Sequence, residues 1–96
     1  ACLASRIPYG DPITAEKLTQ IGRAEGVLRD LGLRQYRVRH HGDVARIEVA
    51  QADFDAVLTH REHIVAALKA LGYAYVALDL VGFRSGSMNE VIGKDG

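Results

Sequence analysis

The chain has 96 residues, enough for one domain with a modest hydrophobic core. Twelve Lys and Arg residues balance twelve Asp and Glu residues, so no overall field attracts nucleic acid or an anionic membrane. The single cysteine excludes an intrachain disulfide and suits a reducing cytoplasm. No apolar run approaches the roughly 20 residues of a membrane span, and no signal-peptide pattern is seen. We therefore expect a cytoplasmic domain in which any anion site is local.

The opening stretch, residues 1–12, carries the cysteine ahead of any regular element, and we expect it to be an active-site loop. Cys2 lies four residues before Arg6, and a nearby guanidinium would lower the pKa of the thiol and favour the thiolate. Ser5 adds a hydroxyl donor. A lone cysteine is more often a small buried hydrophobic residue, so a reactive and a structural thiol both stay open.

Residues 13–32 are predicted to form an amphipathic helix, with Thr14 as its N-cap and Gly32 as its C-terminal stop. Its apolar face contains Leu18, Ile21, Ala24, Leu28 and Leu31. Gly22 and Gly26 each cost about 1 kcal/mol of helix stability relative to alanine. Because they lack side chains, they would let another backbone approach closely.

Residues 35–50 predict a β-hairpin, because apolar residues alternate with period two around a Gly42-Asp43 turn. If these two residues form the turn, one face contains Tyr36, Val38, His40, Ala45, Ile47 and Val49. The other face contains Arg37, Arg39, His41, Arg46 and Glu48. A slip of one residue would bury the arginines, so the register is well specified.

Two further elements complete the chain. Residues 53–72 predict a second helix, ended by Gly72, whose apolar face contains Val57, Ile64, Leu68 and Leu71. Residues 73–83 predict a third strand, which is nearly all apolar and therefore central or covered. The order α-β-β-α-β predicts a single α+β domain over residues 13–92. Two helices pack on one face of a three-stranded, mainly antiparallel sheet, and residues 93–96 form a frayed tail.

The polar face of the hairpin is the first candidate site. Like charges directly across a ladder destabilise a strand pair, yet the pairing sets Arg39 opposite Arg46, with Arg37 beside them. One interpretation is a solvated face tempered by Glu48. The other is a site where guanidinium groups hold a phosphate or carboxylate, which would relieve their repulsion. Arg84, flanked by small residues and hydroxyls in GFRSGSMNE, repeats the pattern.

Metal-binding residues give a weaker signal. Glu25 lies on the flank of the first helix's apolar face, where a partly buried carboxylate requires a cation. An arginine is the first candidate partner, and a divalent metal shared with Glu48 is the alternative. His60 and His63 have the spacing of helical metal ligands, but the further ligands that zinc requires are absent.

Three segments together resemble the carboxyl-terminal part of the LarE family: CLASRIPYGDPIT, YRVRHHGDVARIEV and LDLVGFRSGSMNE. The resemblance covers the chain from Cys2 to Glu90. It implies an ATP-dependent sacrificial sulfur transferase of the PP-loop superfamily. The implied substrate is a pyridinium biscarboxylic acid mononucleotide, in biosynthesis of the nickel-pincer cofactor of lactate racemase. The S-G-G-x-D-S motif of the PP-loop domain is absent here, so ATP and magnesium would bind elsewhere in a longer protein and this chain alone is expected to be inactive.

The resemblance also implies roles for individual residues. In the family a protein cysteine attacks the adenylylated substrate and surrenders its sulfur, leaving dehydroalanine. That catalytic cysteine corresponds to Cys2 or to the position before it, which here is Ala1. The positions implied for substrate phosphate binding are Ser5, Arg6, Arg37, Arg39 and Arg84. The functional carboxylates, as candidate metal ligands, correspond to Glu25 and Glu48.

Two other classes of function compete with this one. RNA binding requires aromatic side chains on the open sheet face, whereas Tyr36 is predicted on the core face, so we expect no nucleic-acid partner. An oligomerisation or anion-binding module without activity of its own is the stronger alternative. Open sheet edges, Gly22 and Gly26, and the family resemblance together predict a homo-oligomer. The other expected partners are the mononucleotide substrate and a PP-loop domain, with no membrane.

Overall fold

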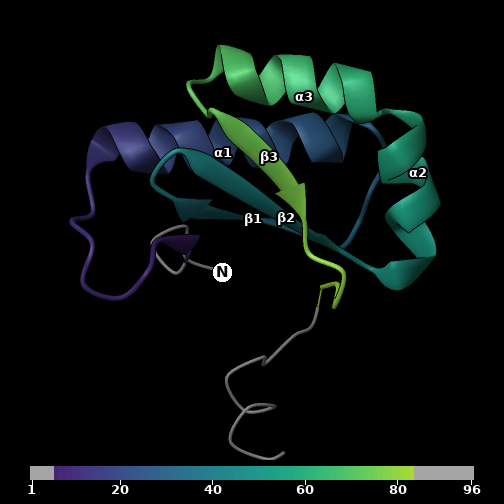
Figure 1. Cartoon of the computed structure of the whole chain (residues 1–96), viewed down its shortest axis with the longest axis horizontal. Coiled ribbons are helices and arrows are strands. Elements are labelled where there is room, and N and C mark those ends of the chain that lie inside the picture. The colour runs from purple at the N-terminus through teal and green to yellow at the C-terminus, as the bar shows by residue number, and fades with distance from the viewer. Residues whose placement is uncertain (1–5, 84–96) are drawn as a thin grey trace, which may run out of the picture.

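The structure is a computed structural model, in which residues 6–83 are described (Figure 1). In chain order the elements are α1 (Ala15–Asp30), β1 (Tyr36–His41), β2 (Val44–Val49), the 3₁₀ helix η2 (Gln51–Asp53), α2 (Phe54–Thr59), α3 (Arg61–Ala70) and β3 (Tyr75–Leu78). The predicted α+β class is confirmed. Among residues 6–83, no helix has the length and hydropathy needed to cross a membrane.

Capping residues set the limits of the two longer helices. Thr14 begins α1 as predicted, because its Oγ1 accepts a hydrogen bond from the backbone N–H of Lys17 at 3.1 Å. Gly32 and Gly72 follow α1 and α3 with φ of +93° and +111°, the left-handed conformation that favours glycine. Their N–H groups donate to the carbonyls of Arg29 and Lys69, which closes each helix end.

The prediction of one continuous helix over residues 53–72 is wrong. His60 has φ of −101° and ψ of 20°, and the helix is broken there into α2 and α3. Figure 1 shows that the two pieces run in different directions, with α2 at the end of the sheet and α3 along it. The periodic pattern survives this break because Val57 of α2 and Ile64 of α3 are both buried. Periodicity alone therefore did not reveal the change of direction.

The sheet has the order β1-β2-β3, and the predicted hairpin register is confirmed. β1 and β2 are antiparallel, with Arg37 opposite Glu48 and Arg39 opposite Arg46. β3 pairs with β2 in parallel, so the sheet is mixed and its longer ladder is antiparallel. The prediction that the third strand is central or covered is wrong, since β3 is a short edge strand in which Tyr75 is 66% exposed.

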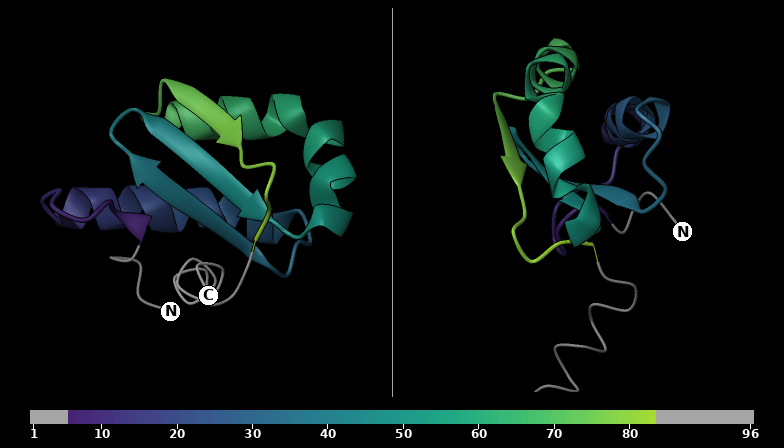
Figure 2. Two further views of the ribbon diagram at one scale, coloured as in Figure 1. Left: turned by 60° about the horizontal axis from the view of Figure 1, so that its bottom comes forward. Right: turned by 90° about the vertical axis from the view of Figure 1, so that its right-hand side faces the viewer.

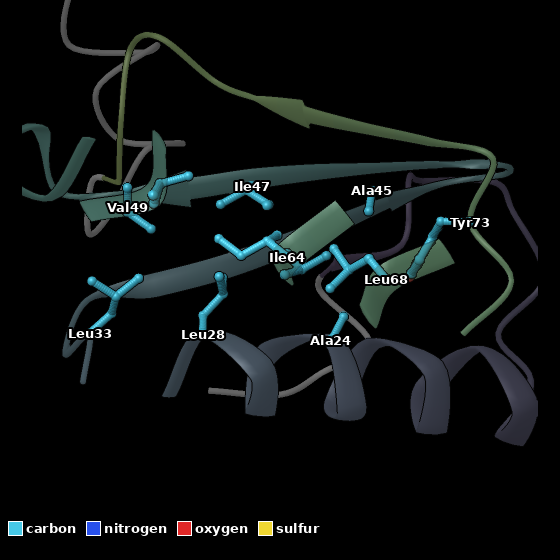
Figure 3. Close-up of a cluster of buried hydrophobic side chains, with 11 residues drawn as sticks. Ala24, Leu28, Leu33, Ala45, Ile47, Val49, Ile64, Leu68 and Tyr73 are labelled. Atoms are coloured by element: carbon cyan, nitrogen blue, oxygen red, sulfur yellow. The ribbon is translucent and has the colours of Figure 1, made fainter. Parts of the chain in front are cut away.

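The core lies between the sheet and the helices α1 and α3, which pack on the same face of the sheet (Figure 2). Figure 3 shows the cluster of buried side chains from both layers. Its members are Ala24, Leu28, Leu33, Val38, Ala45, Ile47, Val49, Val57, Ile64, Leu68 and Tyr73. With one face of the sheet covered in this way, the opposite face is left for charged side chains.

Candidate anion-binding site

The face of the sheet opposite the helices carries the predicted charged residues and one that the sequence analysis missed. We call this surface the polar face and define it by Arg37, Arg39, His41, Arg46, Glu48 and Asp79. Asp79 follows directly after β3, two residues beyond Ala77, which pairs with Arg46. It was overlooked because it lies in an otherwise apolar run. Asp79 is two residues from Ala77, and alternate residues of a strand point to the same face, so this spacing places Asp79 on the same face as Arg46.

Carboxylates separate the arginines that face each other across the hairpin. Glu48 Oε2 accepts hydrogen bonds from Arg39 Nε at 3.4 Å and from Arg46 Nη1 at 3.0 Å. Arg46 Nη1 also donates to Asp79 Oδ2. The repulsion expected between Arg39 and Arg46 is thus reduced by Glu48 between them, and the interpretation of a face tempered by Glu48 describes these two arginines well.

A second ion pair lies at the edge of β1 that faces away from β2. Glu25 Oε2, on α1, accepts hydrogen bonds from Arg6 Nε at 2.8 Å and from the backbone N–H of Val38 at 2.9 Å. Arg6 and Glu25 are 7% and 9% exposed. The arginine partner expected for Glu25 is therefore confirmed. The same carboxylate satisfies a backbone group of β1 that does not pair with β2.

Arg37 differs from the other arginines of the polar face. Its guanidinium carbon lies 4.8 Å from the centre of the Phe83 ring, a cation–π contact. Its Nε is buried without a hydrogen-bond partner among residues 6–83. Burial lowers the pKa of Arg37, and the positive charges of Arg39 and Arg6 lower it further. The group stays protonated because a free guanidinium has a very high pKa, so Arg37 presents a charge whose hydrogen-bonding capacity is only partly used.

The predicted site residues of the described region converge. The pKa of Arg37 responds to the charges of Arg6 and Arg39 and, in the opposite sense, to those of Glu48 and Glu25. The ion pair at the edge of β1 and the polar face thus share one electrostatic environment. Three further predicted site residues, Cys2, Ser5 and Arg84, lie outside the described residues.

The predicted metal site stays a prediction, and the arrangement does not favour it. Glu25 and Glu48 both accept hydrogen bonds from arginines, which a cation would have to displace. Within residues 6–83, no three His, Cys, Asp or Glu side chains gather closely enough to hold a metal ion. His60 and His63 are exposed, in line with a solvated helix surface.

A buried histidine on the core face is separate from the polar face. His40 Nδ1 and the Tyr73 hydroxyl are 3.0 Å apart, and their rings pack edge to face. Burial lowers the pKa of His40, and it raises the pKa of Tyr73 to about 12. The hairpin pattern placed His40 on the core face, but its partner, 33 residues away, was not predicted.

Known proteins are similar in sequence to most of this chain. No protein-family model matches the chain. Over 92 residues it is 44% identical to the pyridinium-3,5-bisthiocarboxylic acid mononucleotide synthase of Lactiplantibacillus plantarum, a match that covers 96% of the chain and 33% of the synthase. The resemblance to the carboxyl-terminal part of the LarE family is confirmed.

Two further relatives match most of the chain. An uncharacterized protein of Synechocystis is 43% identical over 95 residues, covering 97% of the chain and 35% of the relative. An uncharacterized protein of Methanocaldococcus jannaschii is 30% identical over 84 residues, covering 88% of the chain and 33% of the relative. The chain thus spans about a third of the length of the curated relatives it matches.

Proposed function

We propose that this domain binds the anionic substrate of a LarE-type sulfur transferase, a pyridinium carboxylic acid mononucleotide, on its polar face. The observation that carries the proposal is Arg37, a charged side chain whose buried Nε has no hydrogen-bond partner among residues 6–83. A buried donor without a partner costs about 1–3 kcal/mol. A phosphate oxygen would supply the missing acceptor and neutralise the charge.

The charge balance of the site supports an anionic ligand. The polar face and the edge of β1 together contain the four arginines Arg6, Arg37, Arg39 and Arg46 and the three carboxylates Glu25, Glu48 and Asp79, which leaves a net charge of +1. The carboxylates form ion pairs with Arg6, Arg39 and Arg46. The excess positive charge is therefore centred on Arg37, where the substrate phosphate is proposed to bind.

The remaining steps of the reaction belong to groups outside the described residues. In this proposal a PP-loop domain binds ATP and magnesium and adenylylates a substrate carboxylate, and Cys2 or the position before it donates sulfur. The product would serve nickel-pincer cofactor biosynthesis. Donation converts the cysteine into dehydroalanine, so a loss of about 34 Da mapped to Cys2 after turnover supports this role. An unchanged protein mass after product has formed contradicts it.

Titration of the chain with a pyridinium carboxylic acid mononucleotide tests the binding step. Arg37→Ala should weaken binding about tenfold or more, because a hydrogen bond to a charged group contributes about 1.5–3 kcal/mol. Arg23→Ala is the matched control, since Arg23 is exposed on α1 and takes no part in the polar face. Equal binding by both variants, or no binding by the unaltered chain, contradicts the proposal.

The alternative, an oligomerisation module, has its own support. Gly22 and Gly26 line a surface groove along α1, and within residues 6–83 no further strand pairs with the outer edge of β3. Light scattering that shows a defined homo-oligomer, combined with no mononucleotide binding, would favour the module. A homo-oligomer that also binds the mononucleotide would fit both proposals.

A further inference from the structure

The chain departs from regular strand pairing immediately after β3. The backbone N–H of Asp79 donates to the carbonyl of Ile47 at 2.9 Å, and that of Phe83 donates to the carbonyl of Val49 at 2.7 Å. In an uninterrupted parallel ladder the donor that follows Asp79 would be Val81, because alternate residues face the neighbouring strand. Phe83 takes that position instead, so two residues are looped out. We call residues 79–83 the exit bulge.

The exit bulge is closed by contacts of Asp79. Its side-chain Oδ1 accepts a hydrogen bond from the N–H of Val81 at 2.9 Å, and its carbonyl accepts one from the N–H of Gly82 at 3.1 Å. Gly82 has φ of +93°, and a Cβ there would lie 3.1 Å from the carbonyl oxygen of Val49. The looped-out residues, Leu80 and Val81, are 77% and 50% exposed. Asp79 and Gly82 thus stabilise this bulge, even though it exposes the apolar side chains of Leu80 and Val81.

Both ends of the exit bulge contact arginines of the polar face. At its start, Asp79 Oδ2 accepts a hydrogen bond from Arg46 Nη1. At its end, the Phe83 ring lies 4.8 Å from the guanidinium carbon of Arg37. If the strand continued without looping out these residues, Val81 rather than Phe83 would donate to the carbonyl of Val49, and valine has no aromatic ring to place against Arg37. Bulges commonly redirect a side chain in this way near functional sites.

We propose that Asp79 is a positioning residue of the anion site and acts on Arg37 through the exit bulge. Asp79 closes the bulge, and the closed bulge holds Phe83 against the face of the Arg37 guanidinium. An aromatic ring on that face fixes the plane of the guanidinium and leaves its in-plane N–H groups available to an oxyanion. The effect of Asp79 on ligand binding rests on the proposed function, whereas its effect on the position of Arg37 does not.

The positional effect can be measured without a ligand, from the side-chain Nε–H signals of the arginines in an NMR spectrum of the chain. The Phe83 ring current should shift the Arg37 signal, and Phe83→Leu should remove this shift. Asp79→Ala should reduce the same shift, because alanine cannot accept the hydrogen bonds that the Asp79 carboxylate accepts from the N–H of Val81 and from Arg46. Asp55→Ala, the same replacement at an exposed position of α2, is the control and should leave the signal unmoved.

The outcomes separate a positioning role from a merely local one. If Asp79→Ala moves only the signals of Arg46 and of the exit bulge while Arg37 keeps its shift, the inference is overturned. Backbone amide spectra of each variant show whether the fold is kept, and Asp79→Asn provides a second variant that keeps an acceptor oxygen for the N–H of Val81 but loses the charge. Asp79→Asn should keep more of the Arg37 shift than Asp79→Ala, because its amide oxygen can still accept the hydrogen bond from the N–H of Val81.

Binding of the mononucleotide gives an independent measurement. Asp79→Ala and Phe83→Leu should each weaken binding about threefold to tenfold, less than Arg37→Ala. If the unaltered chain binds and both variants bind equally well, the inference fails while the proposed function stands. If the unaltered chain does not bind, the proposed function fails, and the Arg37 signal still decides whether Asp79 positions it.

Discussion

Arg6 Nε donates to Glu25 Oε2 at 2.8 Å, and this ion pair joins the opening loop to α1 beside the edge of β1 that faces away from β2. The same carboxylate oxygen accepts the backbone N–H of Val38. One side chain therefore connects the loop that precedes α1, the helix itself and the first strand of the polar face. The geometry of the candidate site depends on this connection, because the charge of Arg6 also acts on Arg37.

Glu25→Gln should lower the free energy of unfolding by about 3–5 kcal/mol, because it removes the charged partner of Arg6 from a buried ion pair. Urea denaturation measures this change. Asp30→Asn is the control, since it breaks the exposed Arg29–Asp30 pair, whose side chains are 68% and 76% exposed. That pair should contribute at most about 1 kcal/mol. Similar losses for both variants would mean that the pair at Glu25 is not buried in solution.

Replacement by methionine should change the free energy of unfolding much less at Arg37 than at Arg46, although both arginines lie on the polar face. Arg37→Met should leave the free energy of unfolding within about 1 kcal/mol of its original value. It removes a desolvated charge and its repulsion with Arg39, and these gains offset the lost contact with Phe83. Arg46→Met should lower the free energy by about 1.5–3 kcal/mol, because Arg46 forms hydrogen bonds with Glu48 and Asp79. Thermal or urea unfolding compares the two. A larger loss for Arg37→Met than for Arg46→Met would contradict the idea that Arg37 is kept for a ligand.

Stability should fall on acidification because of His40. Burial, together with the charges of Lys17 and His41, holds the pKa of His40 below its ordinary value, and the opposing effect of Asp11 is smaller. The unfolded chain therefore binds more protons than the folded chain once the pH drops below about 6.5, and folding is penalised from there downward. One such group contributes at most about 1.4 kcal/mol per pH unit.

The free energy of unfolding should also fall at alkaline pH, because of Tyr73. Its folded pKa of about 12 lies above the ordinary value of a phenol, so its contribution is complete below about pH 10 and is lost between pH 10 and 12. Urea unfolding at a series of pH values should thus give a plateau from about pH 7 to 10. His40→Gln, which cannot titrate, should flatten the acid side and leave the alkaline side in place. An unchanged acid slope in that variant would assign the effect to other groups.

The hairpin and the core helices could be predicted from the sequence because each depends on local rules. The two-residue turn at Gly42-Asp43 fixed the register, and alternation then separated Arg37 from Val38 correctly. The arginine partner of Glu25 was expected from burial alone, although the sequence could not say which arginine it was. Local rules thus identified the buried face of each of these elements, although they did not reveal the break at His60 between α2 and α3.

The remainder of the site depends on how the third strand docks, which no local rule determines. An apolar run is compatible with a central strand and with an edge strand, so the position of β3 was predicted incorrectly. The exit bulge follows from where β3 meets β2, and the roles of Asp79 and Phe83 follow from that bulge. The spacing of residues within a single segment therefore could not predict the roles of Asp79 and Phe83.

Gly82→Ala should destabilise the chain more than a glycine replacement at the same backbone conformation elsewhere. A left-handed conformation costs an alanine about 1–2 kcal/mol. At Gly82 the added Cβ would also lie 3.1 Å from the carbonyl oxygen of Val49, which accepts the hydrogen bond from Phe83. Relief of that contact requires the exit bulge to move away from β2, which should add about 1–3 kcal/mol to the loss.

Gly32→Ala is the matched control for this prediction, because Gly32 has the same φ of +93° and a Cβ there would meet nothing within 4 Å. Urea denaturation of the two variants separates the cost of the backbone conformation, which they share, from the steric cost, which only Gly82→Ala carries. The displaced bulge should also reduce the ring-current shift of the Arg37 Nε–H signal, whereas Gly32→Ala should leave that signal in place. Equal losses of stability in the two variants, with the Arg37 signal unmoved in both, would show that the exit bulge does not press on β2 and does not hold Phe83 over Arg37.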